Sequence, residues 1–425
     1  MFRFINKIKI VFLVTPLLFA CDDSETVNTA DSPEPQQQIN ENQYVRMQQQ
    51  ANMGAFNYTK ISSTEFVRDY FSLSQQVSST EFMISEAQHF TIPENAVSFS
   101  LNFNNVLAGK DLFIGELQSP SGNIFALWDL IPCFDGTCSM VIPNRNDSLY
   151  SAEAGEWTYR VIAEKRAVEN KQLNNTTINL LVRVNEQYDD SKLATIPVQP
   201  YYTGTQASAD KITEIMAHFV RIFDDNDIII DWKPAIHIEP KSFAVMEASY
   251  ASLKTQTLMK YGKNNVVNIY FVERFSEIQE AEQALIHPRL AEEVRMLLGI
   301  AAGIPGSLGT TGDANGVMVS LGIYNDQAYI ETSLIAATAA HEMGHFLGLF
   351  HTTEAAEVFN GPFDSFDPLL DTPNCKFTEA GELPPINTCP DIDNLMFPLA
   401  REDGQLSTNL THDQRFILRN SPLAY

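Results

Sequence analysis

Residues 340–351 read Ala340-His341-Glu342-Met343-Gly344-His345-Phe346-Leu347-Gly348-Leu349-Phe350-His351, the order H-E-x-x-H-x-x-G-x-x-H. On a helix, positions four apart lie on one face, so His341 and His345 can present two imidazoles to one metal ion. Gly348 can end the helix in a left-handed turn, after which His351 can supply a third nitrogen. Three nitrogens and a water make the open tetrahedral site of a catalytic zinc.

Glu342 follows the first histidine and can reach a water at the metal without binding the metal itself. The surrounding residues 331–349 predict a helix with Thr332 or Ser333 as its N-cap. This helix is apolar nearly all round, which is typical of a buried central helix. The alternative is a buried helix that happens to carry histidines. Three unpartnered histidines would be costly to bury on such a segment, so a metal site is favoured.

The first 20 residues have the pattern of an export signal. Three basic residues precede an apolar stretch at 10–19, which is too short to span a bilayer because a spanning helix needs about 20 residues. Leu18-Phe19-Ala20-Cys21 resembles a bacterial lipobox, which predicts cleavage before Cys21 and a lipid on that cysteine. An ordinary secretory signal is the alternative. We therefore expect an exported lipoprotein anchored to a membrane at the cell surface or in the periplasm, or else a secreted protein.

Four further cysteines form two short-range pairs, Cys133 with Cys138 and Cys375 with Cys389. In an oxidising compartment these pairs predict two disulfides. A second zinc site built from thiolates is the alternative, but the paired C-x-x-C spacing of such sites is missing.

Composition and charge limit the class of protein. Hydrophobic residues make up 44% of the 425-residue chain, a globular composition, and the length suggests two or three domains. The formal net charge is −25, and the basic residues never form a long run. This argues against nucleic-acid binding. A solvated acidic surface explains the charge, and a preference for cationic substrates is the alternative.

The residue pattern divides the chain into a signal at 1–20, a polar tether at 21–55 and two domains. An autoinhibitory propeptide is the competing interpretation of the tether. Residues 56–187 show short apolar alternation, clearest at 97–103, which predicts an all-β, jelly-roll-like sandwich. From residue 193 to 425 the pattern becomes α/β (α+β), with a strand at 193–198, a helix at 209–223 capped by Ser208, a strand at 266–272 and a terminal helix after Leu410.

Two stretches before the zinc motif invite functional interpretation. Residues 299–312 are rich in glycine, but no Gly-Lys-Ser/Thr follows, so we expect a flexible loop over an active-site cleft rather than a phosphate loop. Residues 315–320 predict a strand. If that strand is exposed at a sheet edge, it can pair with an extended peptide.

With its third histidine, the motif resembles the metzincin zinc proteases. In that family a methionine-containing turn lies under the zinc ligands, and Asp393-Asn394-Leu395-Met396-Phe397-Pro398 matches it through Met396. Asp371-Thr372-Pro373, the pair Cys375 and Cys389, and Phe350-His351-Thr352 are similar to the pappalysin-like, or cytophagalysin-like, branch. The resemblance covers residues 193–425 and implies a metzincin-type catalytic domain. Many metzincins carry a tyrosine two residues after the methionine, and Pro398 stands there instead.

The preceding domain carries a shorter resemblance. Residues 117–123 and 154–161 are similar to the P-domain or pre-peptidase type of jelly roll found beside secreted proteases. No catalytic constellation is evident in it, so we expect it to support folding or to bind a partner.

Taken together, these residues predict a zinc-dependent endopeptidase acting on extracellular or periplasmic proteins. His341, His345 and His351 would hold one zinc ion, and Glu342 would be the general base. One alternative is a metal-binding adhesin or scaffold that no longer cleaves, and another is a zinc hydrolase acting on a non-peptide bond. The acidic residues Asp364, Asp367 and Asp371 also offer oxygens that suit Ca²⁺, although they lack EF-hand spacing and a solvated loop is the favoured explanation.

Overall fold

The computed structural model describes residues 58–60, 66–72, 77–104, 112–126, 139–173, 177–184, 193–205, 207–239, 241–250, 252–276, 298–309, 315–322, 330–353, 367–375, 386–398 and 405–425. The predicted signal and tether, Cys21, the pair Cys133 and Cys138, and Asp364 lie outside the described residues. No helix in these ranges is long and apolar enough to cross a membrane.

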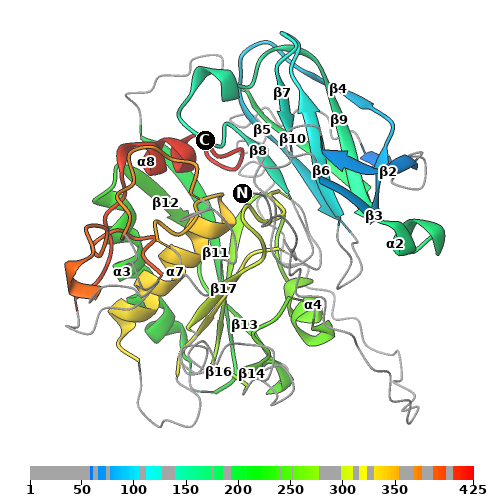
Figure 1. Ribbon diagram of the computed structural model, residues 1–425. Coiled ribbons are helices and arrows are strands. Elements are labelled where there is room, and N and C mark those ends of the chain that lie inside the picture. Colours follow the sequence, from blue (N-terminus) through cyan, green and yellow to red (C-terminus); the bar gives the residue numbers. More distant parts are fainter. Residues whose placement is uncertain are drawn as a thin grey trace, which may run out of the picture.

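The N-terminal half consists of two antiparallel sheets that share one core (Figure 1). The first has the order β1-β10-β5-β8, formed by Tyr58–Lys60, Thr177–Val184, Ala96–Asn104 and Met140–Ile142. The second has the order β2-β3-β9-β6-β7, with β4 also paired to β9, formed by Phe66–Ser72, Val77–Ser85, Gly155–Glu164, Leu112–Gln118, Ile124–Ala126 and Gln88–Ile92. The expected antiparallel sandwich is therefore present.

Aromatic side chains fill the space between the two sheets. Trp157 of β9 is fully buried and lies edge-to-face on Phe99 of β5, with ring centroids 5.0 Å apart. Phe90 and Phe125 stack on the same indole at 6.3 Å. The apolar residues of the alternating stretch 97–103 thus face this core, as the period of two predicts.

The polar residues of the same strand are buried as well. Ser98, Ser100 and Asn102 are all 0% exposed, because the second half of the chain covers their face of the sheet. The Oδ1 atom of Asn102 accepts a hydrogen bond from the Leu308 amide at 2.9 Å. The alternation in β5 therefore separates two interfaces, one apolar and one polar, rather than a core from solvent.

The second half of the chain is built on a mixed sheet of order β12-β11-β15-β18-β17, with β13 also paired to β11. The strands are Ile228–Trp232, Ala194–Thr203, Val267–Val272, Val317–Ser320, Gly299–Ala301 and Ile236–Ile238. All pairings are parallel except that of β17 with β18. A small two-stranded sheet joins β14, Val245–Met246, to β16, Arg274–Phe275.

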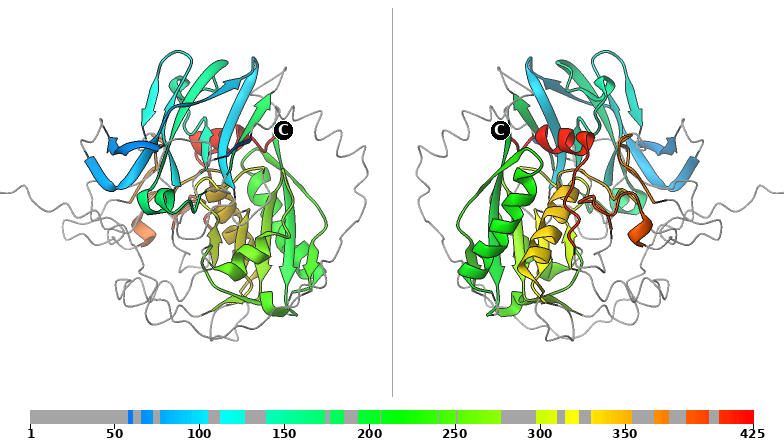
Figure 2. Two further views of the ribbon diagram at one scale, coloured as in Figure 1. Left: turned by 90° about the vertical axis from the view of Figure 1, so that its right-hand side faces the viewer. Right: turned by 90° about the vertical axis from the view of Figure 1, so that its left-hand side faces the viewer.

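Two helices, α3 (Ala209–Asp224) and α7 (Thr332–Phe346), lie side by side against this sheet (Figures 1 and 2). The prediction of a helix at 209–223 is confirmed, and the Ser208 hydroxyl caps it by accepting from the Lys211 amide at 3.1 Å. The shorter helices are α2 (Lys165–Glu169), α4 (Leu253–Met259) and α8 (His412–Arg419). Helix α8 confirms the predicted terminal helix and begins with a capping box of Thr411 and Gln414.

Two predictions about residues 299–320 are wrong. The strand β18 is not exposed at an edge: it lies between β15 and β17, and all four of its residues are buried. Residues 299–301 form the edge strand β17 rather than loop, and residues 305–309 are buried between α7 and the sandwich instead of covering a cleft. Glycines there allow close packing: a Cβ on Gly306 would lie 2.1 Å from the Phe346 ring.

Candidate metal centre

Helix α7 holds three of the four motif side chains. Its body is apolar and buried, as expected, with Ala336, Ala339 and Ala340 all 0% exposed. The predicted N-cap is wrong: Glu331 occupies that position, and no side chain caps the helix. The hydroxyl of Thr332 instead donates to the Glu214 carboxylate of α3 at 2.9 Å, which ties the start of α7 to its neighbouring helix.

Gly348 turns the chain after α7, as predicted. Its φ of 110° lies in the left-handed region. The Gly348 amide donates to the His345 carbonyl and the Leu349 amide to the Gly344 carbonyl, both at 2.9 Å. This pair of bonds is a Schellman motif, which satisfies carbonyls at the helix end and reverses the chain. His351 is thereby brought back beside the helix.

The three histidines converge on one point. The Nε2 atom of His351 lies 3.2 Å from Nε2 of His341 and 3.0 Å from Nε2 of His345. One ring nitrogen from each lies within 4.8 Å of the other two. Two nitrogens bound to a tetrahedral zinc at about 2.0–2.1 Å are roughly 3.3 Å apart, so the three rings are arranged as such a site requires.

Backbone carbonyls set the protonation of the two helical histidines. Nδ1 of His341 lies 2.7 Å from the Leu395 carbonyl, and Nδ1 of His345 lies 2.7 Å from the Leu349 carbonyl. A carbonyl only accepts, so each Nδ1 carries the proton and donates it. Each Nε2 is then left with a lone pair directed at the common point. This is the tautomer in which a histidine binds a metal.

Burial keeps these imidazoles neutral. Burial and, to a smaller extent, the neighbouring His351 together lower the pKa of His341 to about 3, against a raising effect of the Leu395 carbonyl. Burial also lowers the pKa of His345 well below its usual value, with His351 and His341 acting in the same direction. Two neutral imidazoles with directed lone pairs, and a third ring whose Nε2 atom faces both of them, form a donor set that fits Zn²⁺.

Glu342 is the acidic group of the centre. Its side chain is 8% exposed, and burial raises its pKa to about 8. A positive charge placed at the convergence point of the imidazoles would act in the opposite direction and favour the carboxylate. Glu342 is therefore a buried carboxyl group whose proton affinity depends on the charge of the neighbouring site.

The segment with Met396 lies beneath the helix. Met396 is 0% exposed, and a Cβ on Gly344 would lie 2.5 Å from its sulfur. The Met396 carbonyl accepts from the Thr352 amide at 3.2 Å, while the preceding Leu395 carbonyl orients His341. This turn thus contacts the segments of both the first and the third histidine.

Sequence reasoning missed Asp391. This residue is 1% exposed, and its Oδ2 atom accepts from the hydroxyls of Thr352 and Thr353, both at 2.6 Å. Thr353 in turn accepts from the amide of Cys375 at 2.7 Å. The predicted disulfide between Cys375 and Cys389 is present, with a Cα–Cα distance of 4.9 Å. An aspartate in a polar stretch resembles a solvated one, so the sequence carries no signal for this role.

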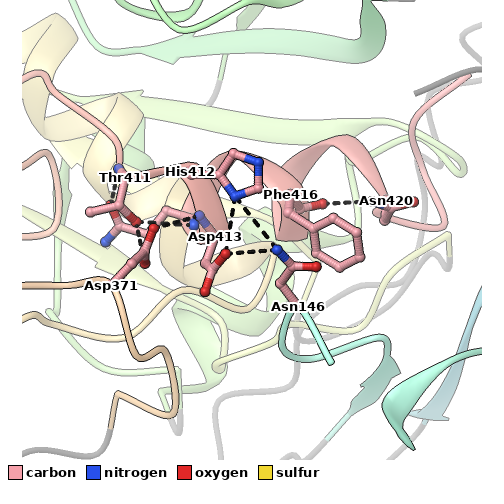
Figure 3. Close-up of polar contacts among 8 residues, drawn as sticks. Asn146, Asp371, Thr411, His412, Asp413, Phe416 and Asn420 are labelled. Atoms are coloured by element: carbon pink, nitrogen blue, oxygen red, sulfur yellow. Dashed lines mark hydrogen bonds and ion pairs between the residues drawn. The ribbon is translucent and has the colours of Figure 1, made fainter. Parts of the chain in front are cut away.

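Asp371, one of the residues considered for calcium, lies beside the start of helix α8 (Figure 3). Asp371 caps that helix: Oδ1 accepts from the Thr411 hydroxyl and Oδ2 from the Asp413 amide, both at 2.9 Å. Asp413 accepts from Asn146 of the sandwich at 2.8 Å and lies 3.1 Å from Nδ1 of His412. Capping accounts for Asp371, and calcium binding stays a prediction.

Comparison with known proteins gives little. No family model matches the chain, and no curated protein does. Among solved structures, archaemetzincin from Methanopyrus kandleri aligns at 13% identity over 55% of this chain and 98% of that one, with a TM-score of 0.29. Metalloproteinase-II from Bacteroides fragilis aligns at 13% identity over 50% of this chain, with a TM-score of 0.22. The aligned part spans 57% of that second protein. Likeness this slight supports no assignment, which must rest on the centre itself.

Proposed function

We propose that this chain is a zinc-dependent endopeptidase of the metzincin type. The observation that carries the proposal is the convergence of the three imidazoles, with Nε2 of His351 3.2 Å from Nε2 of His341 and 3.0 Å from Nε2 of His345. The buried Glu342 follows the first of these histidines on the same helix. Three protein ligands leave a tetrahedral ion one open position, which is the feature of catalytic rather than structural zinc.

When bound, zinc supplies Lewis acidity, which polarises a carbonyl and brings the pKa of water to about 7. His341, His345 and His351 would hold the ion, and their Nδ1 contacts fix two of the rings in place. Glu342 would accept the proton of the attacking water at its carboxylate and then deliver that proton to the leaving amine. Pro398 has no side-chain proton to donate, so Glu342 serves both transfers without help from that position.

The decisive variant is Glu342→Gln in the full chain. It preserves shape but removes the proton acceptor, so we expect wild-type zinc content and a loss of cleavage of casein or peptides by at least about 100-fold. His351→Ala is the companion variant and should lose zinc as well as activity. Cleavage by Glu342→Gln at the wild-type rate would overturn the mechanism.

The same assay separates the two other functions. Metal binding with no cleavage of any protein or peptide would favour a non-cleaving adhesin or scaffold. Cleavage products identified by mass spectrometry would reveal a hydrolase of non-peptide bonds. Loss of cleavage on chelation and its recovery with added Zn²⁺ would support the endopeptidase.

We further propose that the substrate is a protein outside the cytoplasm and that the chain is held at a membrane through a lipid on Cys21. The disulfide between Cys375 and Cys389 supports an oxidising compartment. Labelling of wild type but not of Cys21→Ser with a fatty-acid analogue in a bacterial host tests the anchor. Labelling of both would exclude it.

A further inference from the structure

The edge strand β17 begins directly against the catalytic carboxylate. Gly299, its first residue, is buried, and a Cβ built there would lie 2.6 Å from Cγ, 2.7 Å from Oε1 and 2.9 Å from Cδ of Glu342. Real Cβ contacts are not this short, so any larger residue at 299 must displace either the strand or the carboxylate.

The lack of room for a side chain, rather than the backbone conformation, explains why position 299 is a glycine. Seven glycines among the described residues have a positive φ, and Gly299 is not one of them. It pairs with Val319 in a regular antiparallel register. In such a strand an alanine is normally favoured over glycine because it loses less backbone entropy on folding.

Neither side of the contact is free to retreat. The Leu298 carbonyl accepts from the Ser320 amide at 2.8 Å, which fixes the start of β17 on the sheet. On the other side, the Nδ1 bonds of His341 and His345, both 2.7 Å long, hold the turn of α7 that carries Glu342. The carboxylate is therefore the movable part, and it would be pushed from its place against β17.

We propose that Gly299 is a positioning residue of the proposed peptidase, and that the space left by its missing side chain holds the Glu342 carboxylate beside the three histidines. This inference rests on the proposed function. Gly299 binds no metal and donates no proton. It acts only through Glu342.

The test is Gly299→Ala in the full chain. We expect unchanged zinc content, an unchanged KM and a kcat lower by about 10- to 100-fold, since small misplacements of a reacting group have effects of this size. Ala301→Ser is the control, because it adds one atom two residues along the same strand, and it should keep the wild-type kcat. Wild-type kcat in Gly299→Ala, or loss of its zinc, would overturn the inference.

A second background isolates the contact. Glu342→Asp shortens the side chain by one methylene and so leaves room for a Cβ at position 299. Adding Gly299→Ala to this variant should therefore lower kcat by less than about threefold. The difference from the effect in wild type would show that the two positions are coupled. An equal loss in both backgrounds would mean that the alanine acts elsewhere, and would overturn the inference. Inactive wild type would instead count against the proposed function.

Two measurements do not depend on activity. In crystal structures of the zinc-loaded protein, the Glu342 carboxylate should be displaced in Gly299→Ala relative to wild type, while the histidines stay in place. An undisplaced carboxylate would overturn the inference. If Gly299→Ala fails to fold, Glu342→Ala should restore folding to it by opening the space, and failure of the double variant to fold would also overturn it.

Discussion

Gly344 and Met396 are in direct contact between helix α7 and the turn beneath it: a Cβ on Gly344 would lie 2.5 Å from the methionine sulfur. Gly344 lies between Glu342 and His345, and the carbonyl before Met396 orients His341. The glycine therefore sets how closely the turn approaches the helix that carries the metal ligands.

We predict that Gly344→Ala destabilises the protein by about 1–3 kcal/mol, because it overpacks a closed contact. Helix propensity alone predicts the opposite, since alanine in a helix interior is favoured over glycine by about 1 kcal/mol. Denaturant unfolding of the zinc-loaded protein measures the effect. In a Met396→Ala background, which removes the sulfur, the same substitution should cost nothing further. A stabilising Gly344→Ala would show that the turn lies further away.

Much of this centre could be predicted from the sequence, because short-range spacing determines it. The positions of His341 and His345 follow from the period of a helix, and the turn at Gly348 follows from the conformational freedom of glycine. The pair Cys375 and Cys389 is close in sequence, so its bond also follows. In each case the partners are separated by no more than 14 residues or belong to one regular element.

The features that were missed depend on contacts between distant segments. Alternation in β5 does not reveal what covers its polar side, and Asn102 is buried against Leu308, more than two hundred residues away. The strand β17 has three residues, too few for a period to appear in the sequence. Asp391 anchors Thr352 and Thr353 only because the fold places it beside them. Pattern cannot supply such contacts, since they arise from packing.

Asp391 is expected to stabilise the third ligand's segment. In Asp391→Ala the two threonine hydroxyls lose their buried acceptor, which should cost about 1–3 kcal/mol for each unpaired group. Because Thr352 follows His351 directly, we also expect faster zinc loss to a chelator. Thr352→Val removes one of the two bonds and should show a smaller effect of the same kind. If Asp391→Ala kept its zinc as long as wild type, Asp391 would not contribute to holding the third ligand.

Asp367 should make stability depend on pH. Burial raises its pKa to about 7 from 3.8, with smaller raising effects of Asp371 and Asp413 against the lowering contacts of the Leu369 amide and Thr372. A raised folded-state pKa means that stability is present below pH 4 and is lost as pH rises through 7. Asp367→Asn should therefore match wild type near pH 4 and exceed it at pH 8, by up to about 4 kcal/mol. Equal stability at both pH values would contradict the shift.

The sandwich is expected to stabilise the metal centre through the buried bond between Asn102 and Leu308. The segment 305–309, which contains Leu308, also contacts helix α7. Its Gly306 amide donates to the Phe346 carbonyl at the end of that helix, at 2.9 Å. Asn102→Ala leaves the Leu308 amide buried without its acceptor, so we predict a loss of about 1–3 kcal/mol in unfolding free energy.

Asn146→Ala is the matched control for that variant. It removes an exposed contact between the same two parts, from Asn146 to Asp413 at 2.8 Å, and surface contacts of this kind contribute within about 0.5 kcal/mol. Asn102→Asp keeps an acceptor but places a carboxylate at a fully buried position, so it should be at least as destabilised as Asn102→Ala. Chemical denaturation of all three variants, with zinc content measured in parallel, decides the matter. If Asn102→Ala were no less stable than Asn146→Ala, the buried polar face of β5 would not contribute to the stability of the part of the fold that carries α7.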